Sequence, residues 1–451
     1  MTSRSWPRRA AEDPLIPTHI LPRQVLDPDP ITGQDRRAFA VITSHATRGC
    51  VLSRSRRNAQ GGLLSVSPLI PRGAHLQVLK HARIPQHALS ETDRLLARPA
   101  EAAATAALIA ANLCWRNRRQ PAVTAHDGKV RADHPQIARA IGEIQSATSL
   151  RLMLRDPLAF VWRYALGWRA VVEDDQPLTL DARAYGELVH ELLKRTVDAL
   201  EPLPGYARAS RHEIEAALVT STEIIRVRWP LERSTPPALL WQHTLAAAAQ
   251  LALKAMTLDE ALQPSTRSWT ELAFGNIGDG TSGILPWRSD AAVTIPGTNM
   301  RIRGSIDRLD LTGDGRAVRL SDYKTGSEPR RASEIVLARG AELQRVIYAI
   351  AARQLLPDNP RVIARLIFLG DQEPKAYRLP DIDQAISELS THITAAIALL
   401  RTGQGLPGPD AQEEYNEFRV ALPASPATYF QIKNAAFMRA FGEFARVWNC
   451  R

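Results

Sequence analysis

Alternation between polar and apolar residues is clearest in residues 301–326, which read RIRGSIDRLDLTGDGRAVRLSDYKTG. Two alternating runs flank TGDG, and this arrangement predicts a β-hairpin closed by a tight turn. If the DG pair forms the centre of a two-residue turn, Asp307 lies directly opposite Asp322, with Cβ atoms roughly 4.5–5.5 Å apart. Lys324 points to the same face, because it follows Asp322 by two positions along the strand.

Two facing carboxylates repel each other, and burial of the pair would raise one of their pKa values. The neighbours expected on that face are apolar: Leu309, Leu311, Val318 and Leu320. A divalent cation would relieve the repulsion, because Mg2+ prefers hard oxygen ligands. A nearby ammonium could then stabilise a developing anion or orient an attacking water. The alternative is a solvated hairpin with incidental charges.

Periodicity elsewhere in the second half of the chain predicts helices alternating with strands, which indicates an α/β core. Helices are expected at 181–200, 340–356 and 381–402, and strands near 269–275, near 291–295 and at 361–370.

The composition of the chain indicates which cellular compartment and which partners to expect. The 451 residues carry a net charge of +10, which favours polyanionic partners such as nucleic acid, although an Arg-rich proteome would give the same excess. The three cysteines, Cys50, Cys114 and Cys450, are far apart, which argues against a disulfide framework and fits a reducing compartment. The chain shows neither an apolar signal core nor a long apolar run, so we expect a cytoplasmic protein with no membrane partner.

Four short motifs follow one another along the chain. They are Gly186 to His190 in the spacing GxxxH, GSIDRLD at 304–310, DYKTG at 322–326, and Gln344 to Tyr348 in the spacing QxxxY. This set, spread over some 160 residues, resembles the PD-(D/E)XK nuclease superfamily and specifically its RecB/AddB-type nuclease domain. The resemblance implies a central mixed sheet flanked by helices, here with an additional N-terminal helical region.

The resemblance also implies roles for individual residues. Metal ligation falls to His190, Asp307 and Asp322, with the carbonyl of Tyr323 near the metal, and Lys324 becomes the catalytic lysine. Gln344 and Tyr348, which share one helix face, would position the lysine region or the DNA strand. The alternatives are a structural role for His190, and packing of Gln344 and Tyr348 against the sheet.

Two further residues are candidates for DNA contact or for support of the ligands. Glu271 stands where the family often has a strand glutamate, and it could lie near the metal or form a salt bridge at a strand end. Arg308 could contact a backbone phosphate.

One position departs from the family. Many AddB-type nucleases carry a four-cysteine iron–sulfur cluster whose first ligand is a Cys-Pro, and Asp156-Pro157 stands there in this chain. Because such clusters need cysteine thiolates, no Fe–S cluster is expected, and packing alone would close the domain.

Residues 36–57 resemble the last helicase motif of UvrD-like proteins, with His45 where that motif has its nucleotide-sensing arginine. The chain contains no GxxxxGK[ST] phosphate loop, so no ATP cofactor is expected. We therefore expect the C-terminal portion of an AddB-like repair subunit with a degenerate helicase remnant. The expected divisions are an irregular segment 1–34, the helicase remnant 35–75, a helical connector 76–140, the nuclease domain 141–403 and a C-terminal extension 404–451.

The expected activity is hydrolysis of DNA phosphodiester bonds with Mg2+ or Mn2+ in double-strand break repair or recombination, with exonuclease action favoured over endonuclease action. The expected partners are a DNA single strand or duplex end and, by resemblance, an AddA-type helicase-nuclease subunit. The rival hypothesis is a noncatalytic DNA-binding scaffold subunit that retains the nuclease fold.

Overall fold

The computed structural model describes most of the chain. The described residues are 6–8, 25, 29–58, 62–71, 73–74, 77, 90–170, 177–201, 203–258, 262–275, 285–370, 373–413 and 416–450. They divide into two compact units, one of residues 1–116 with 422–429 and the other of 117–421 with 430–451. Most of the expected segment 1–34, and residues 78–89 of the expected connector, lie outside the described residues.

In the described residues of the first unit, the longer regular elements are helices. Its helices are α2 (Ile31–Ser44), α3 (Glu91–Ala97), α4 (Pro99–Ala104) and most of α5 (Ala106–Arg119). α3 begins where the Ser90 side chain accepts a hydrogen bond from the backbone N–H of Asp93. The described residues between 45 and 74 show no regular strand, and a bridge joins Arg57 to Leu63.

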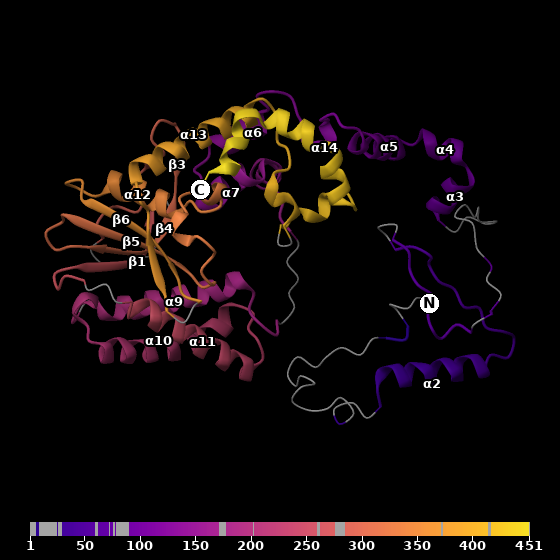
Figure 1. Ribbon diagram of the computed structural model, residues 1–451, viewed down its shortest axis with the longest axis horizontal. Coiled ribbons are helices and arrows are strands. Elements are labelled where there is room, and N and C mark those ends of the chain that lie inside the picture. Colours follow the sequence, from indigo (N-terminus) through magenta and orange to yellow (C-terminus); the bar gives the residue numbers. More distant parts are fainter. Residues whose placement is uncertain are drawn as a thin grey trace. The chain divides into compact units, whose positions relative to one another are not determined.

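The second unit contains a five-stranded mixed sheet, as expected from the sequence (Figure 1). Its strands, in spatial order, are β1 (Arg267–Phe274), β4 (Gly304–Leu311), β5 (Ala317–Lys324), β6 (Arg361–Phe368) and β7 (Lys375–Arg378). Strands β5 and β6 are parallel, and every other neighbouring pair is antiparallel. A separate two-stranded ladder joins β2 (Val293–Thr294) to β3 (Arg301–Ile302).

The β4–β5 hairpin has the predicted register. Its four cross-strand pairs are Arg308–Ser321, Leu309–Leu320, Asp310–Arg319 and Leu311–Val318. Gly315 adopts a φ of +68°, which glycine tolerates and which this turn requires. Asp307 and Asp322 are the next residues beyond the Arg308–Ser321 pair. The hairpin therefore brings both carboxylates to the end of the β4–β5 ladder that is far from the turn.

Helices cover both faces of the sheet (Figure 1). On one face lie α9 (Ala182–Leu200), α10 (Arg211–Glu232) and α11 (Ala238–Met256), whose apolar residues pack with Tyr323, Ile367 and Leu369. On the other face, α12 (Gln344–Leu355) packs on β5 and β6, and α13 (Ile382–Arg401) packs on α12. α12 also connects the parallel strands β5 and β6, as a crossover connection requires.

The remaining helices pack beside this core. They are α6 (Pro135–Gly142), α7 (Ala147–Arg155), α8 (Pro157–Phe160), a π-helical turn (Val161–Ala165) and α14 (Pro426–Phe441). Short 3-10 turns lie at Ala125–Asp127, Tyr206–Arg208, Ala332–Glu334, Ala338–Gly340, Pro409–Gln412, Arg419–Ala421 and Gly442–Asn449. Of the helices in the described residues, none is long and apolar enough to cross a membrane.

Polar contacts tie the C-terminal segment to the helices before the sheet. Asp156 accepts hydrogen bonds from the backbone N–H groups of Ala159 and Gly408 and from Asn416 Nδ2. In α14, the fully buried Lys433 forms an ion pair with Asp127 at 2.8 Å. Through these hydrogen bonds Asp156 joins the start of α8 to the segment that contains Gly408 and Asn416.

Candidate metal centre

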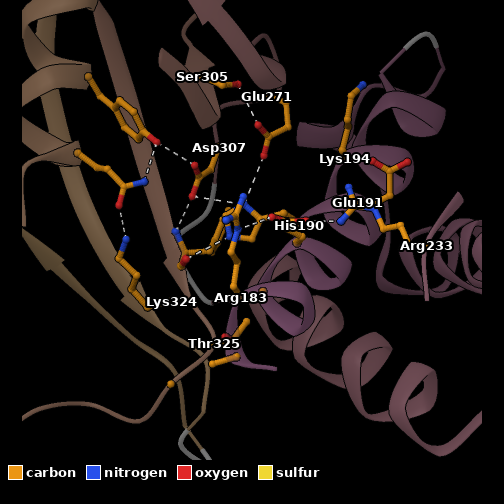
Figure 2. Close-up of a pocket in the computed structure, with 17 residues that line it drawn as sticks. Arg183, His190, Glu191, Lys194, Arg233, Glu271, Ser305, Asp307, Lys324 and Thr325 are labelled. Carbon is orange, nitrogen blue, oxygen red and sulfur yellow. Dashed lines mark hydrogen bonds and ion pairs between the residues drawn. The ribbon is translucent and has the colours of Figure 1, made fainter. Parts of the chain in front are cut away.

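A cleft with a volume of about 710 Å3 opens between α9 and the sheet (Figure 2). Side chains of α9, β1, β4, β5 and α12 line it, together with Thr325 and Gly326, which follow β5. Among the predicted site residues, the lining includes His190, Asp307, Lys324, Gln344 and Tyr348. The fold therefore gathers residues that are up to 158 positions apart, the separation between His190 and Tyr348.

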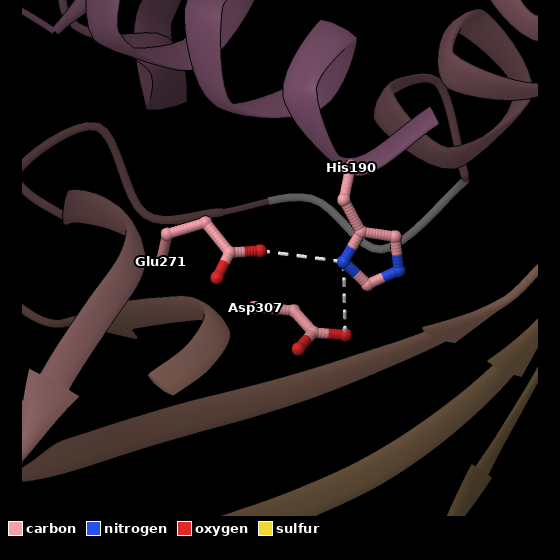
Figure 3. Close-up of side chains that lie close together, drawn as sticks. All are labelled: His190, Glu271 and Asp307. Atoms are coloured by element: carbon pink, nitrogen blue, oxygen red, sulfur yellow. Dashed lines mark hydrogen bonds and ion pairs between the residues drawn. The ribbon is translucent and has the colours of Figure 1, made fainter. Parts of the chain in front are cut away.

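Three potential ligands from three different elements meet in this cleft. One ligand atom each from His190, Glu271 and Asp307 lies within 4.8 Å of the other two. His190 Nδ1 is 3.3 Å from Glu271 Oε1 and 3.7 Å from Asp307 Oδ2 (Figure 3). An imidazole and two carboxylates directed at one point form a donor set that suits a divalent cation such as Mn2+ or Mg2+.

Glu271 reaches this point through an unusual backbone. On either side of it, Thr270 pairs with Arg308 and Leu272 with Ile306, so Glu271 lies across β1–β4 from Asp307. Its φ of +48° is left-handed, a conformation that costs roughly 1–3 kcal/mol for a non-glycine residue and is often found at functional sites. Ser305 Oγ donates a 2.9 Å hydrogen bond to Glu271 Oε2 and holds the carboxylate in place.

The electrostatics of His190 follow from the same carboxylates. Burial lowers the pKa of His190, but Asp307 and Glu271 more than compensate, and the pKa rises to about 9. His190 in turn lowers the pKa of Glu271 against the effect of burial. At this raised pKa the protonated ring of His190 balances the charge of the two carboxylates. A bound cation would take over that role, because only the neutral imidazole can act as a ligand. The other ring nitrogen, Nε2, lies 3.2 Å from the carbonyl oxygen of Tyr323.

Asp322, which the resemblance suggested as a metal ligand, is not one of the three clustered residues. Lys324 Nζ is 2.8 Å from Oδ2 of Asp322. That contact has poor hydrogen-bond geometry, and among the described residues neither Asp322 oxygen has a hydrogen-bond donor. Burial raises the pKa of Asp322 to about 6, although Lys324 acts in the opposite direction. Asp322 is therefore a buried carboxylate with unused ligand capacity beside the cluster.

Gln344 and Tyr348 link the lysine to the cluster. Lys324 Nζ donates a hydrogen bond to Gln344 Oε1, and Gln344 Nε2 donates to the Tyr348 hydroxyl at 3.3 Å. Tyr348 donates in turn to Asp307 Oδ1 at 2.9 Å. This geometry agrees with the positioning role that the resemblance implies for both residues, and the role itself remains a prediction.

The structure places Arg308 away from the cleft. Its side chain is 4% exposed, forms an ion pair with Asp310 at 3.1 Å and donates a hydrogen bond to the Tyr206 hydroxyl. Successive residues of a strand point to opposite faces, so Arg308 points away from Asp307 and toward α9–α11. A phosphate contact by Arg308 is incompatible with this burial, and we do not retain that expectation.

Glu342 is a neighbour of the site that sequence reasoning missed. It lies two residues before α12, its side chain is 12% exposed, and its Oε2 atom is 3.7 Å from Lys324 Nζ. Burial and the nearby Asp322 raise the pKa of Glu342, while Lys324 and Arg345 lower it. The only signal in the sequence was its position two residues before Gln344, and that position alone does not indicate a side chain directed at the lysine.

Comparison with known proteins adds independent evidence. The family model described as "PD-(D/E)XK nuclease superfamily" matches residues 145–416, which is more than half of the chain. Two curated relatives, from Lacticaseibacillus casei and Lacticaseibacillus paracasei, are each named as a subunit of an ATP-dependent helicase/deoxyribonuclease. Each is 32% identical over 146 residues, and the match covers 31% of this chain but only 12% of the relative. The family match includes the sheet, the cleft and all four motifs, and the chain belongs to the PD-(D/E)XK nuclease superfamily.

Proposed function

We propose that this chain is a Mg2+- or Mn2+-dependent deoxyribonuclease that acts in DNA repair or recombination. The observation that carries the proposal is the convergence of His190, Glu271 and Asp307 on one point, with the nearby ammonium of Lys324 paired to Asp322. A purely structural cluster would have no need for a buried carboxylate that lacks hydrogen-bond donors next to a lysine. Such poorly satisfied groups are expected where a ligand completes the site.

Each residue has a distinct part in the proposed reaction. His190, Glu271 and Asp307 would hold the cation, and Asp322 could turn an oxygen toward it. A cation bound there would supply Lewis-acid chemistry, which makes water a better nucleophile and stabilises charge on the phosphate. Lys324 would stabilise the negative charge that develops on the phosphate oxygens in the transition state. Gln344 would orient the lysine, and Tyr348 would orient Asp307.

DNA is the proposed substrate, because the relatives are named as parts of a deoxyribonuclease and the chain carries a net charge of +10. We favour exonuclease action on a single strand or a duplex end, and a helicase-nuclease partner of the AddA type. The same relatives are named ATP-dependent, but we assign no ATP chemistry to this chain because it lacks a phosphate loop.

A cleavage assay tests the proposal. The purified chain is incubated with end-labelled single-stranded DNA and with blunt duplex DNA in Mg2+, in Mn2+ or in EDTA. We expect cleavage with either cation and none in EDTA, and we expect Lys324→Met to abolish cleavage while leaving the protein folded. Cleavage that persists in EDTA would refute metal dependence.

A noncatalytic DNA-binding scaffold is the alternative. It predicts DNA binding without cleavage under any of these conditions, and equal binding by wild type and Lys324→Met. The chain retains Asp307 and Lys324 in one cleft, with the buried Asp322 paired to Lys324, and this favours the nuclease over the scaffold.

A further inference from the structure

Lys324 is surrounded by more acceptors than its proposed role requires. Its ammonium is 2.8 Å from Asp322 Oδ2, donates to Gln344 Oε1 and lies 3.7 Å from Glu342 Oε2. A lysine ammonium has three protons to donate. In this arrangement Gln344 accepts one of them, while the carboxylates of Asp322 and Glu342 lie at ion-pair distance, so both carboxylates compete with a phosphate oxygen for the ammonium.

Asp322 is the partner that a bound cation would draw away. Its carboxylate is buried and acts on the pKa of His190 in the cluster, whereas Glu342 lies near Arg345 and the start of α12. A divalent cation near Asp322 also repels the ammonium, because two like charges in a poorly solvated site interact strongly. Without a second carboxylate, the lysine would either keep Asp322 from the cation or leave the site.

We propose that Glu342 is a positioning residue that retains the Lys324 ammonium when Asp322 turns to the cation. The exchange removes Asp322 as a competitor for the ammonium, which leaves the ammonium more available to the phosphate, and it lowers the electrostatic cost of placing the cation beside the lysine. This inference rests on the proposed metal-dependent nuclease function, which it deepens by assigning a role to Glu342.

A structural role for Glu342 must be separated from this one. Its carboxylate also interacts with the backbone N–H of Arg345 and could simply stabilise the first turn of α12. Glu342→Gln keeps the size of the side chain and an acceptor for that N–H, but removes the negative charge. Loss of charge is therefore the tested variable, and a thermal melt reports any structural effect separately.

The experiment measures Mn2+ binding by calorimetry and single-turnover DNA cleavage at saturating Mn2+. It compares wild type, Glu342→Gln, Lys324→Met and the double variant, with Glu223→Gln as the control. Glu223 lies on α10, is 60% exposed and pairs with Arg226, so its loss should change neither readout. We expect Glu342→Gln to slow cleavage by about tenfold or more, with little change in the DNA concentration needed for half-maximal rate.

Mn2+ affinity provides the sharper test. In Glu342→Gln the lysine would pair with Asp322 alone and compete with the cation, so Mn2+ affinity should fall by about threefold or more. In the Lys324→Met background no ammonium competes, and the same substitution should change Mn2+ affinity by less than about twofold. A plain counter-charge would lower affinity in both backgrounds, because its effect does not pass through the lysine.

The outcomes are separable. The inference would be overturned if Glu342→Gln cleaved DNA at the wild-type rate. It would also be overturned if Glu342→Gln lowered Mn2+ affinity equally with Lys324 present and with Lys324→Met. Either result would leave the proposed function intact. Failure of the wild-type protein to bind Mn2+ or cut DNA would overturn the proposed function and this inference with it.

If Glu342→Gln melts below the assay temperature, Glu342→Asp replaces it. That variant keeps the negative charge but, because its side chain is one methylene shorter, places the carboxylate farther from the lysine. It should therefore cleave DNA more slowly than wild type, and a wild-type rate would contradict the inference.

Discussion

Asp156 offers a quantitative test of how the C-terminal segment is held to the helix that precedes the cleft. Its carboxylate is 2% exposed and accepts hydrogen bonds from Ala159, Gly408 and Asn416. Burial and, to a smaller extent, the nearby Asp410, which pairs with Arg151 and Arg155, together raise its pKa from 3.8 to about 7 against the lowering effect of these hydrogen bonds. The folded state therefore prefers the protonated acid.

The sign and size of the effect follow from linkage. Because the folded pKa lies above the unfolded value, the stability contribution is fully present below pH 3.8 and is lost as the pH rises to about 7. A shift of about three units corresponds to about 4 kcal/mol in total, of which roughly 2.5 kcal/mol falls between about pH 5 and about pH 8. We expect the wild-type free energy of unfolding to fall by this amount relative to a variant that cannot ionise.

Asp156→Asn is that variant, and urea denaturation followed by circular dichroism at the two pH values is the assay. The amide introduced by this substitution would face the donating amide of Asn416, which adds an offset, but this offset is independent of pH and cancels in the comparison. The difference in stability between wild type and variant should therefore change with pH. If the two proteins lose stability in parallel from pH 5 to pH 8, the reasoning about Asp156 is wrong.

Three further predictions concern the site, the C-terminal helix and DNA binding. Asp307→Ala and Asp322→Ala should each abolish cleavage, yet the metal-free Asp322→Ala protein should be as stable as wild type or more stable by up to about 1–3 kcal/mol, because an unsatisfied buried carboxylate is removed; a large loss of stability in a thermal melt would contradict this. Lys433→Met should lower the free energy of unfolding by about 3–5 kcal/mol, because it leaves the buried Asp127 without this cation. Urea denaturation measures this change, and an unchanged free energy of unfolding would contradict the prediction. DNA affinity measured in EDTA should fall with salt with a logarithmic slope of roughly −3 to −4 if four to six phosphates of a single strand are contacted, and a flat dependence would show that the basic charge serves another purpose.

The hairpin could be predicted from the sequence because its determinants are local. The turn signal TGDG and the two-residue period of the strands set the register, and the observed pairs from Arg308–Ser321 to Leu311–Val318 follow it, although the loop spans residues 313–316 and not only the expected two-residue turn. The helix at 181–200 could be predicted for the same reason, because Asp181 caps it and its apolar residues repeat with helical spacing.

The family resemblance left the role of Glu271 open, and the structure was needed to place it in the cluster and to find Glu342 at all. Glu271 joins the cluster through a left-handed backbone and through pairing with a strand 36 positions away, neither of which leaves a local pattern in the sequence. Glu342 approaches Lys324 from the segment that leads into α12, and its direction depends on how that helix packs on the sheet. Arg308 was different, because strand alternation already implied that it points away from Asp307.

The most direct test of the central claim is the Mn2+ dependence of single-turnover DNA cleavage by wild type and Glu271→Gln, with Glu223→Gln as the control. The cluster of His190, Glu271 and Asp307 predicts that removing one carboxylate ligand raises the Mn2+ concentration needed for half-maximal cleavage by about tenfold or more, while the control matches wild type. If wild type and Glu271→Gln give the same Mn2+ curve, the cation required for cleavage is not held by this cluster.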